Sequence, residues 1–318
     1  MAAATANSKV YEIITEKIID QLKAGVIAWH KPWRGGDAPM NLKTKKPYRG
    51  INPFLLGCQA YTSPYWLTHK QAVESTGEQT CLKGQKSTII IFWKFLEQKN
   101  GKRNAAGKLP QFPMLRYYNV FNVEQVVGFV KGEHYPAPVV ALPDFNPIES
   151  AERIIADFAV ANPTLNILEP KGHQACYVLS ADEIRMPPRE SFETEQSYYA
   201  TLFHESGHAT RHKSRLDRAL DSGRRGDTSY ACEELVAEFT AAFLCGHAGI
   251  SPALNQASGN ESFSDSAAYI AHWLQRLGDD PKLVVSAGGK AQKAADYILG
   301  INWDEKSKKV ENEEAVAV

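Results

Sequence analysis

The sequence lacks the features that mark membrane-bound and secreted proteins. Its 318 residues contain no apolar run of about 18, the length that a membrane-spanning helix needs. The opening stretch, MAAATANSKVYEIITEK, has no basic segment followed by an apolar one, so it does not have the pattern of a secretory signal. We therefore expect a protein of the cytoplasm with no membrane role.

Cysteine is scarce and shows no pairing pattern. The sequence has five cysteines, which is an odd number, and no C-x-x-C pair. Scattered cysteines of this kind indicate reduced thiols rather than a disulfide framework, and we expect no chemistry from them. The five are Cys58, Cys81, Cys176, Cys232 and Cys245.

Net charge is also missing, but the positive and negative residues are separated along the chain. Residues 1–130 hold 18 Lys and Arg against 8 Asp and Glu, and the remainder holds 18 against 28. A basic half suits a polyanionic partner. The sign changes at KGEHYPAPVVALPDFNPIES, whose four prolines cannot lie inside a regular helix. We therefore predict two domains, 8–130 and 149–303, joined by a linker at 131–148.

The stretch FHESGH has the spacing of a metal-binding helix. The surrounding segment, TEQSYYATLFHESGHATRHKSRLDR, predicts a helix of about five turns that begins at a Thr194 cap. His204 and His208 then lie one turn apart on one face, where two imidazoles can bind the same ion. Glu205 is offset by one position and can act on a water as a general base. Two imidazoles and a carboxylate suit zinc or another divalent metal.

We expect the third ligand on a second helix, SYACEELVAEFTAAFLCGHAGI. In the thermolysin-like arrangement the third ligand is a glutamate on such a helix, and an acid one turn later supports a ligating histidine. Glu234 and Glu238 match that pattern, so Glu234 is the expected ligand. Glu233 points about 100° away from Glu234 around the helix, so we expect it to contribute little. His212 continues the histidine stripe, but it lies at the end of the helix, where attraction of a cation to the helix dipole is the simpler explanation.

Three segments of the acidic half stand out together: MPPRESFETEQSYYATLFHESGHATRHKSRLDR, YACEELVAEFTAAFLCGHAGI and AAYIAHWLQRLGDDPKLVVSAGGKAQKAADYILG. They resemble the zincin-like metallopeptidase domain of ArdC-type antirestriction proteins, which mobile elements carry. The resemblance covers most of residues 182–300. It implies His204, His208 and Glu234 as metal ligands and Glu205 as the acid in the catalytic position, but not whether peptide bonds are cut.

The basic half interleaves aromatic and cationic residues. Unpaired bases need aromatic faces for stacking and cations along their phosphates, so this mixture favours single-stranded nucleic acid. The half shows no recognition helix, zinc finger or basic zipper, which argues against base readout in a duplex groove. The predicted DNA-contact residues are Trp29, Lys31, Trp33, Arg34, Lys43, Lys45, Lys46, Tyr48, Arg49 and Lys86.

Different surroundings are expected for different aromatic residues of this half. Trp29 and Trp33 flank a proline in a predicted loop, and Tyr48 lies in a predicted turn, YRGINPF, so these side chains are expected at the surface. Trp93 follows the strand-like segment STIIIF and is expected in the core.

Five segments of the basic half also form a recognisable set: VYEIITEKIIDQLKAG, AWHKPW, YRGIN, YWLTHKQA and KGQKSTIIIFW. They resemble the N-terminal single-stranded DNA-binding domain of ArdC, which plasmid-encoded primases share, over about residues 8–130. The resemblance implies a protein that accompanies incoming DNA and shields it from restriction.

The predicted fold class is α+β, with a basic α+β domain followed by a mainly helical zincin-like domain. Two functions share every motif: a single-stranded DNA-binding antirestriction protein, and a metallopeptidase that DNA directs to DNA-bound proteins. A plain cytosolic peptidase is a third alternative. The expected partners are single-stranded DNA and a restriction enzyme or another DNA-bound protein.

Overall fold

The computed structural model describes residues 2–24, 38–57, 59, 61–97, 109, 111–136, 147–169, 175–192, 194–218, 228–250 and 267–302. They belong to two compact units: unit 1 comprises Met1–Pro143 and Asp265–Ser286, and unit 2 comprises Asp144–Ser264 and Ala287–Val318. Both units contain helices and strands, which confirms the predicted α+β class. None of the helices in the described ranges has the length and apolar character that membrane crossing demands.

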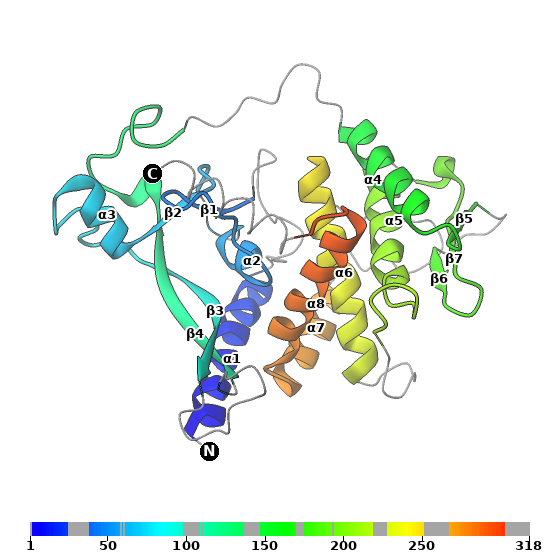
Figure 1. The fold of residues 1–318 in the computed structure, drawn as a ribbon, viewed down its shortest axis with the longest axis horizontal. Coiled ribbons are helices and arrows are strands. Elements are labelled where there is room, and N and C mark those ends of the chain that lie inside the picture. Colours follow the sequence, from blue (N-terminus) through cyan, green and yellow to red (C-terminus); the bar gives the residue numbers. More distant parts are fainter. Residues whose placement is uncertain are drawn as a thin grey trace. The chain divides into compact units, whose positions relative to one another are not determined.

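Unit 1 combines a four-stranded sheet with helices (Figure 1). The strand order is β1-β2-β4-β3; β1 is parallel to β2, and the other neighbours are antiparallel. Its elements are α1 (Ala2–Lys23), β1 (Met40–Asn41), α2 (Asn52–Gly57), β2 (Tyr65–Thr68), α3 (His69–Thr76), β3 (Thr88–Glu97), β4 (Gln111–Asn122), the 3-10 helix η2 (Val123–Gln125) and α7 (Ala267–Asp279).

Helix α1 buries one face because its apolar residues recur at helical spacing. It packs on β4 and on α7, so the second stretch of unit 1, Asp265–Ser286, contacts the helix with which the first stretch begins. The hydroxyl of Thr15 donates to the carbonyl of Pro281 at 2.7 Å and ties the two stretches together. The buried residues of α1 include Val10, Ile14, Ile18 and Leu22.

The sheet carries a core cluster of Tyr48, Leu56, Trp66, Ile90 and Val120. The side chain of Asn52 occupies the outer edge of β3: it donates to the carbonyl of Ile91 and accepts from its amide, each at 2.8 Å. These bonds replace a neighbouring strand at that position. β2 pairs with β4 at Val120, Phe121 and Asn122, whereas β3 pairs with β4 from Gln111 to Val120, so the β3–β4 hairpin extends past the end of β2.

Two aromatic side chains lie where the sequence patterns did not predict them. Trp93, predicted in the core, is 47% exposed, because it lies on β3 at the edge of the sheet, whereas its pairing partner Leu115 on the central strand β4 is 2% exposed. Tyr48, predicted on an exposed turn, is 6% exposed, because its ring packs into the core cluster with Trp66. Both predictions were wrong.

Unit 2 places helices around a small sheet of order β5-β7-β6, in which β5 is parallel and β6 antiparallel to β7. Helix α5 packs against α4, α6, β6 and β7. The elements are α4 (Pro147–Ala161), β5 (Asn166–Leu168), β6 (Cys176–Val178), β7 (Glu183–Arg185), the 3-10 helix η3 (Arg189–Ser191), α5 (Glu195–Ala209) and α6 (Thr228–Ala248). Helix α8 (Leu283–Ile298) begins in unit 1 and continues in unit 2.

Helix α5 begins as the sequence predicted and ends earlier. Thr194 is its N-cap, and the Thr194 hydroxyl accepts a backbone N–H of the first turn at 3.1 Å. The helix ends at Ala209, short of the predicted five turns. Side chains take up the last carbonyls: the Thr210 hydroxyl donates to the carbonyl of Gly207 and the Arg215 guanidinium to that of Ala209, each at 2.7 Å.

Gly207 lies where α5 approaches α6 closely. A Cβ at this position would lie 3.1 Å from the Cα of Ala237 and 3.2 Å from the Cβ of Thr240, both of which are fully buried. The approach explains a glycine in mid-helix, where it costs about 1 kcal/mol relative to alanine. Close packing of these two helices fixes the positions of the side chains that they carry.

Candidate metal centre and nucleic-acid interface

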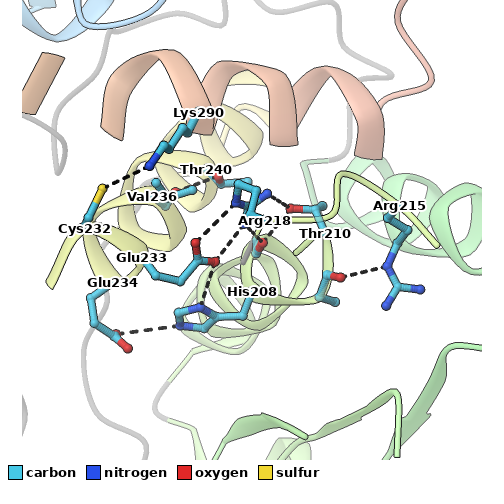
Figure 2. Close-up of polar contacts among 12 residues, drawn as sticks. His208, Thr210, Arg215, Arg218, Cys232, Glu233, Glu234, Val236, Thr240 and Lys290 are labelled. Carbon is cyan, nitrogen blue, oxygen red and sulfur yellow. Dashed lines mark hydrogen bonds and ion pairs between the residues drawn. The ribbon is translucent and has the colours of Figure 1, made fainter. Parts of the chain in front are cut away.

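Helices α5 and α6 bring the three predicted ligand side chains together. The Nε2 atoms of His204 and His208 are 3.2 Å apart, and each lies 3.7 Å from Oε2 of Glu234. Figure 2 shows Glu234 of α6 directed at the ring of His208. One donor atom from each residue lies within 4.8 Å of the other two. Two imidazoles and a carboxylate that converge in this way suit a divalent ion.

Opposite charges stabilise one another in this cluster. Burial alone would lower the pKa of His208, but hydrogen bonds with Glu233 and Glu234 outweigh burial and raise that pKa to about 10. Burial also acts to lower the pKa of His204, and the hydrogen bond with Glu234 again raises it. Burial would raise the pKa of Glu234, yet its hydrogen bonds with the two histidines hold that pKa well below its usual range.

Glu233 belongs to the cluster, which the sequence analysis did not predict. Its side chain is 6% exposed, and its Oε1 lies 3.5 Å from Nδ1 of His208 (Figure 2). Adjacent residues on α6 diverge by about 100°, but the ring of His208 lies between the two carboxylates and presents one nitrogen to each. Glu233 therefore contacts the ring on the side opposite to Glu234, a contact that its phase on the helix did not lead us to expect.

Three further residues named from the sequence differ in their relation to the cluster. Glu205 is 7% exposed, and its charge acts on both histidines. Glu238 is half-buried one turn after Glu234, and its charge acts on His204. The general-base role of Glu205 and the supporting role of Glu238 stay predictions. His212 lies beyond the end of α5, where its Nδ1 contacts the hydroxyl of Ser214 at 2.7 Å, and it is not one of the three converging ligands.

The predicted DNA-contact residues have different positions. Trp29, Lys31, Trp33 and Arg34 lie outside the described residues. Lys43, Lys45, Lys46 and Lys86 are exposed, Arg49 is half-buried, and Tyr48 is buried. Three of the lysines follow Asn41 in a turn, where the Asn41 side chain accepts the backbone amides of Lys43 and Thr44 at 3.1 and 3.0 Å. This bonding presents the lysines to solvent.

The β3–β4 hairpin carries an exposed surface that the sequence patterns did not indicate. Phe92 of β3 pairs with Arg116 of β4, and paired residues share a face of the sheet. Lys94 lies two positions from Phe92 and Tyr118 two positions from Arg116, so both lie on that same face, because side chains alternate along a strand. All four side chains are exposed, and the rings of Phe92 and Tyr118 are 5.9 Å apart. We call these four residues the aromatic-basic surface. Its signal in the sequence was Arg116-Tyr117-Tyr118, a cation beside two aromatics within a strand.

Further aromatic residues lie beside this surface and on the other face of the hairpin. The buried ring of Tyr48 lies 6.4 Å from the ring of Phe92, so the segment that follows the lysine turn adjoins the aromatic-basic surface. On the other face of the hairpin, Trp93 and Tyr117 are 47% and 48% exposed. The ring of Trp93 contacts that of Tyr11 in α1 at 6.5 Å. Exposed aromatics therefore occupy both faces of the hairpin.

Comparison with known protein families divides the chain into two parts. Residues 8–121 match the N-terminal domain of the anti-restriction factor ArdC. Residues 150–290 match a zincin-like metallopeptidase domain. The first match contains the hairpin, and the second contains the His204, His208 and Glu234 cluster.

Two solved structures of the antirestriction ArdC protein from the R388 plasmid are similar to this chain, at 34% identity over 91% of it. The metal-free structure has a TM-score of 0.67 with 96% of that chain covered, and the Mn(II)-bound structure has 0.69 with 97% covered.

Curated relatives differ greatly in length. Two DNA primases TraC of Escherichia coli are 34% and 33% identical over 91% and 93% of this chain, which spans only 20% and 27% of their length. The uncharacterized protein y4eC of Sinorhizobium fredii is 33% identical over 91% of each chain.

Proposed function

Because the chain belongs to the ArdC family of antirestriction proteins, we propose that it binds single-stranded DNA and so shields the incoming DNA of a mobile element from host restriction. The observation that carries DNA binding is the aromatic-basic surface. Aromatic rings offer faces on which unpaired bases stack, and neighbouring cations follow the phosphates. A restriction enzyme or another DNA-bound protein is the expected protein partner.

Exposure distinguishes this surface from the core aromatics. Phe92 is 46% and Tyr118 is 42% exposed, whereas Trp66 on the adjacent strand is 2% exposed. Leaving rings of this size in water forgoes the gain from burying them, so a ligand that covers them gains that free energy. Lys94 and Arg116 on the same face favour an anionic ligand. The basic turn beyond Tyr48 supplies further cations for a polyanion.

Alanine variants of the surface test the proposal. We expect Phe92→Ala and Tyr118→Ala each to weaken binding to a single-stranded oligonucleotide by about 1–3 kcal/mol, the usual loss of one stacking platform. Because both rings are exposed, the melting temperature should change little. Val127→Ala, which truncates an exposed apolar side chain of unit 1 outside the hairpin, is the control. Wild-type affinity in both hairpin variants would contradict the assignment.

A second candidate function is metal-dependent peptide hydrolysis, and the convergence of the three donors favours it. His204, His208 and Glu234 would hold a divalent metal. A bound ion of this kind polarises a carbonyl oxygen and makes a water more acidic. Glu205, buried beside both histidines, would accept a proton from the attacking water. Protons compete for the same imidazole nitrogens, so metal affinity should fall at acid pH.

The substitution Glu205→Gln tests this second function. The variant should retain metal, because Glu205 is not one of the three converging ligands, and should lose any peptidase activity. Wild type and variant are compared on a broad panel of proteins, with and without single-stranded DNA. Activity that Glu205→Gln retains would exclude Glu205 as the base, and no activity in the metal-loaded wild type would argue against peptidase function.

A further inference from the structure

The ring of His208 is contacted on both of its nitrogens, and the contact on the Nδ1 side belongs to no predicted ligand. We propose that Glu233, held in place by Arg218, is a positioning residue that fixes the ring of His208 with Nδ1 protonated and Nε2 free to bind the ion. The inference rests on the metal centre proposed above. It assigns Glu233 and Arg218, neither of which the sequence patterns indicated.

The geometry separates the two nitrogens of the ring. Oε1 of Glu233 lies 3.5 Å from Nδ1 of His208, while Oε2 of Glu234 lies 3.7 Å from Nε2. A neutral imidazole carries one proton, and the nitrogen without it binds a metal. An acceptor at Nδ1 therefore selects the form whose Nε2 lone pair points at Glu234 and His204. Metal-binding histidines commonly have such a partner on the second nitrogen.

Arg218 holds the Glu233 carboxylate by a two-point contact. Its Nη2 donates to Oε1 of Glu233 at 2.7 Å and its Nε to Oε2 at 3.2 Å. The side chains of Arg218 and Glu233 are only 12% and 6% exposed, so each compensates the burial of the other's charge. Planar two-point pairing also fixes the orientation of the carboxylate, which a single contact would not.

The same guanidinium is bound to the end of α5. Nη1 of Arg218 donates to the hydroxyl of Thr210 at 2.6 Å, and Nη2 donates to the carbonyl of Gly207 at 3.0 Å (Figure 2). The backbone amide of Arg218 donates to the carbonyl of Arg211 at 3.1 Å, which returns the chain to the helix it has just left. Arg218 thus links the turn of α5 that carries His208 to the residue of α6 that faces Nδ1.

Substitutions on both members of the pair test the inference. In Arg218→Met and Glu233→Leu, we expect zinc affinity, measured by competition with a chromophoric chelator, to fall about 10- to 100-fold. Glu233→Gln retains an acceptor for Nδ1–H and should lose less affinity than Glu233→Leu. In the zinc-loaded wild type, proton–nitrogen correlation of the His208 ring should show a slowly exchanging Nδ1 proton, and this signal should be lost in Arg218→Met.

Arg215→Met is the matched control. Arg215 lies three residues before Arg218, and its fully buried side chain pairs with Asp182 and donates to the carbonyl of Ala209. Figure 2 shows Arg215 directed away from Glu233. This variant should lower the melting temperature of the protein without added metal, yet leave zinc affinity within about twofold of wild type and the His208 ring signals unchanged.

The outcomes distinguish this inference from the metal centre itself. If wild type binds zinc and both Arg218→Met and Glu233→Leu bind it equally well with unchanged ring signals, the inference is overturned and the metal centre stands. If wild type binds no zinc, both are overturned. Should Arg218→Met fail to fold, Arg218→Lys keeps the charge without the two-point contact, and wild-type affinity in that variant would contradict the inference.

Discussion

At the scale of single residues, Gly207 sets how closely α5 and α6 approach. Gly207→Ala would gain up to about 1 kcal/mol in helix propensity. Its new Cβ would lie 3.1 Å from the backbone of Ala237, which is fully buried and cannot move alone, and overpacking of this kind costs about 1–3 kcal/mol. We expect a net loss on the order of 1 kcal/mol in the free energy of unfolding, and weaker zinc binding, because α6 carries Glu234.

Gly289→Ala is the control for this prediction. Gly289 lies in α8, in the same unit, and a Cβ there would meet no atom within 4 Å. The substitution should raise the free energy of unfolding by up to about 1 kcal/mol and leave zinc affinity unchanged. Chemical denaturation and zinc titration measure both quantities, and equal stabilisation by the two substitutions would exclude the packing role of Gly207.

Asp182 gives a prediction about pH. Burial alone would raise the pKa of its carboxyl, but hydrogen bonds from Arg215, Tyr177 and Thr164 lower it to about 2. A folded-state pKa below the unfolded value of about 3.9 means that the stabilisation is complete above that pH and is lost as the pH falls from about 4 to about 2. The difference corresponds to roughly 2 kcal/mol in the free energy of unfolding.

Asp182→Asn removes the titrating group and keeps the backbone conformation. Asp182 has a φ of 52°, a region that asparagine tolerates well. Wild type should be more stable than the variant at pH 5, and the gap should shrink by roughly 2 kcal/mol as the pH is lowered to about 2. Stability curves that run parallel over this range would contradict the cited interactions.

Residue spacing predicted which side chains converge in the candidate metal centre, but not the residues around them. His204, His208 and Glu234 were predictable because each lies on a helix whose phase is set by local sequence. The role of Glu233 depends on which side of the His208 ring it reaches, and that of Arg218 on a turn beyond the end of α5. Both follow from packing between segments. Trp93 was placed wrongly for a similar reason: a strand pattern does not show whether the strand lies at the edge of its sheet.

At the scale of elements, the return of α7 to unit 1 leads to a further prediction. The Thr15 hydroxyl donates to the carbonyl of Pro281, and Thr15 is 2% exposed. Thr15→Val keeps the shape of the side chain and leaves that carbonyl without this donor, which should cost about 1–3 kcal/mol in the free energy of unfolding.

Ser75→Ala is the control at this scale. The Ser75 hydroxyl donates to the carbonyl of Gln71 within its own helix, α3, so its loss disrupts no contact between elements. We expect a change of less than about 0.5 kcal/mol, the usual range for substitutions away from such contacts. Denaturation that reports on unit 1 measures both variants, and a Thr15→Val variant as stable as Ser75→Ala would show that the bond to Pro281 contributes nothing.

Secondary structure was predictable where the pattern is local. The cap of α5 at Thr194 follows from a short polar side chain before an apolar stripe. The end of α5 at Ala209 depends on Thr210 and on Arg215, whose side chain returns to the helix from six residues away. The sequence pattern continued past that point and overestimated the helix.

At the scale of the whole molecule, the opposite charges of the two halves correspond to different sites. The basic half contains the aromatic-basic surface and the lysine turn, and the acidic half contains the cluster of His204, His208 and Glu234. The excess charge changes from positive to negative within 131–148, and the first stretch of unit 1 ends in the same range, at Pro143. Composition could not predict that 265–286 belongs to unit 1, because this depends on the packing of α7 on α1.

The most direct test of single-stranded DNA binding is to measure the affinity of the full chain for one oligonucleotide in single-stranded form and as a duplex, at physiological salt. Stacking on exposed rings requires unpaired bases, so we predict clearly tighter binding to the single strand, with little dependence on its sequence. Affinity should fall steeply as salt is raised, because lysine and arginine contacts to phosphate release counterions. Equal affinity for the two forms would contradict the account, since it would leave only non-specific attraction of phosphates to the basic half.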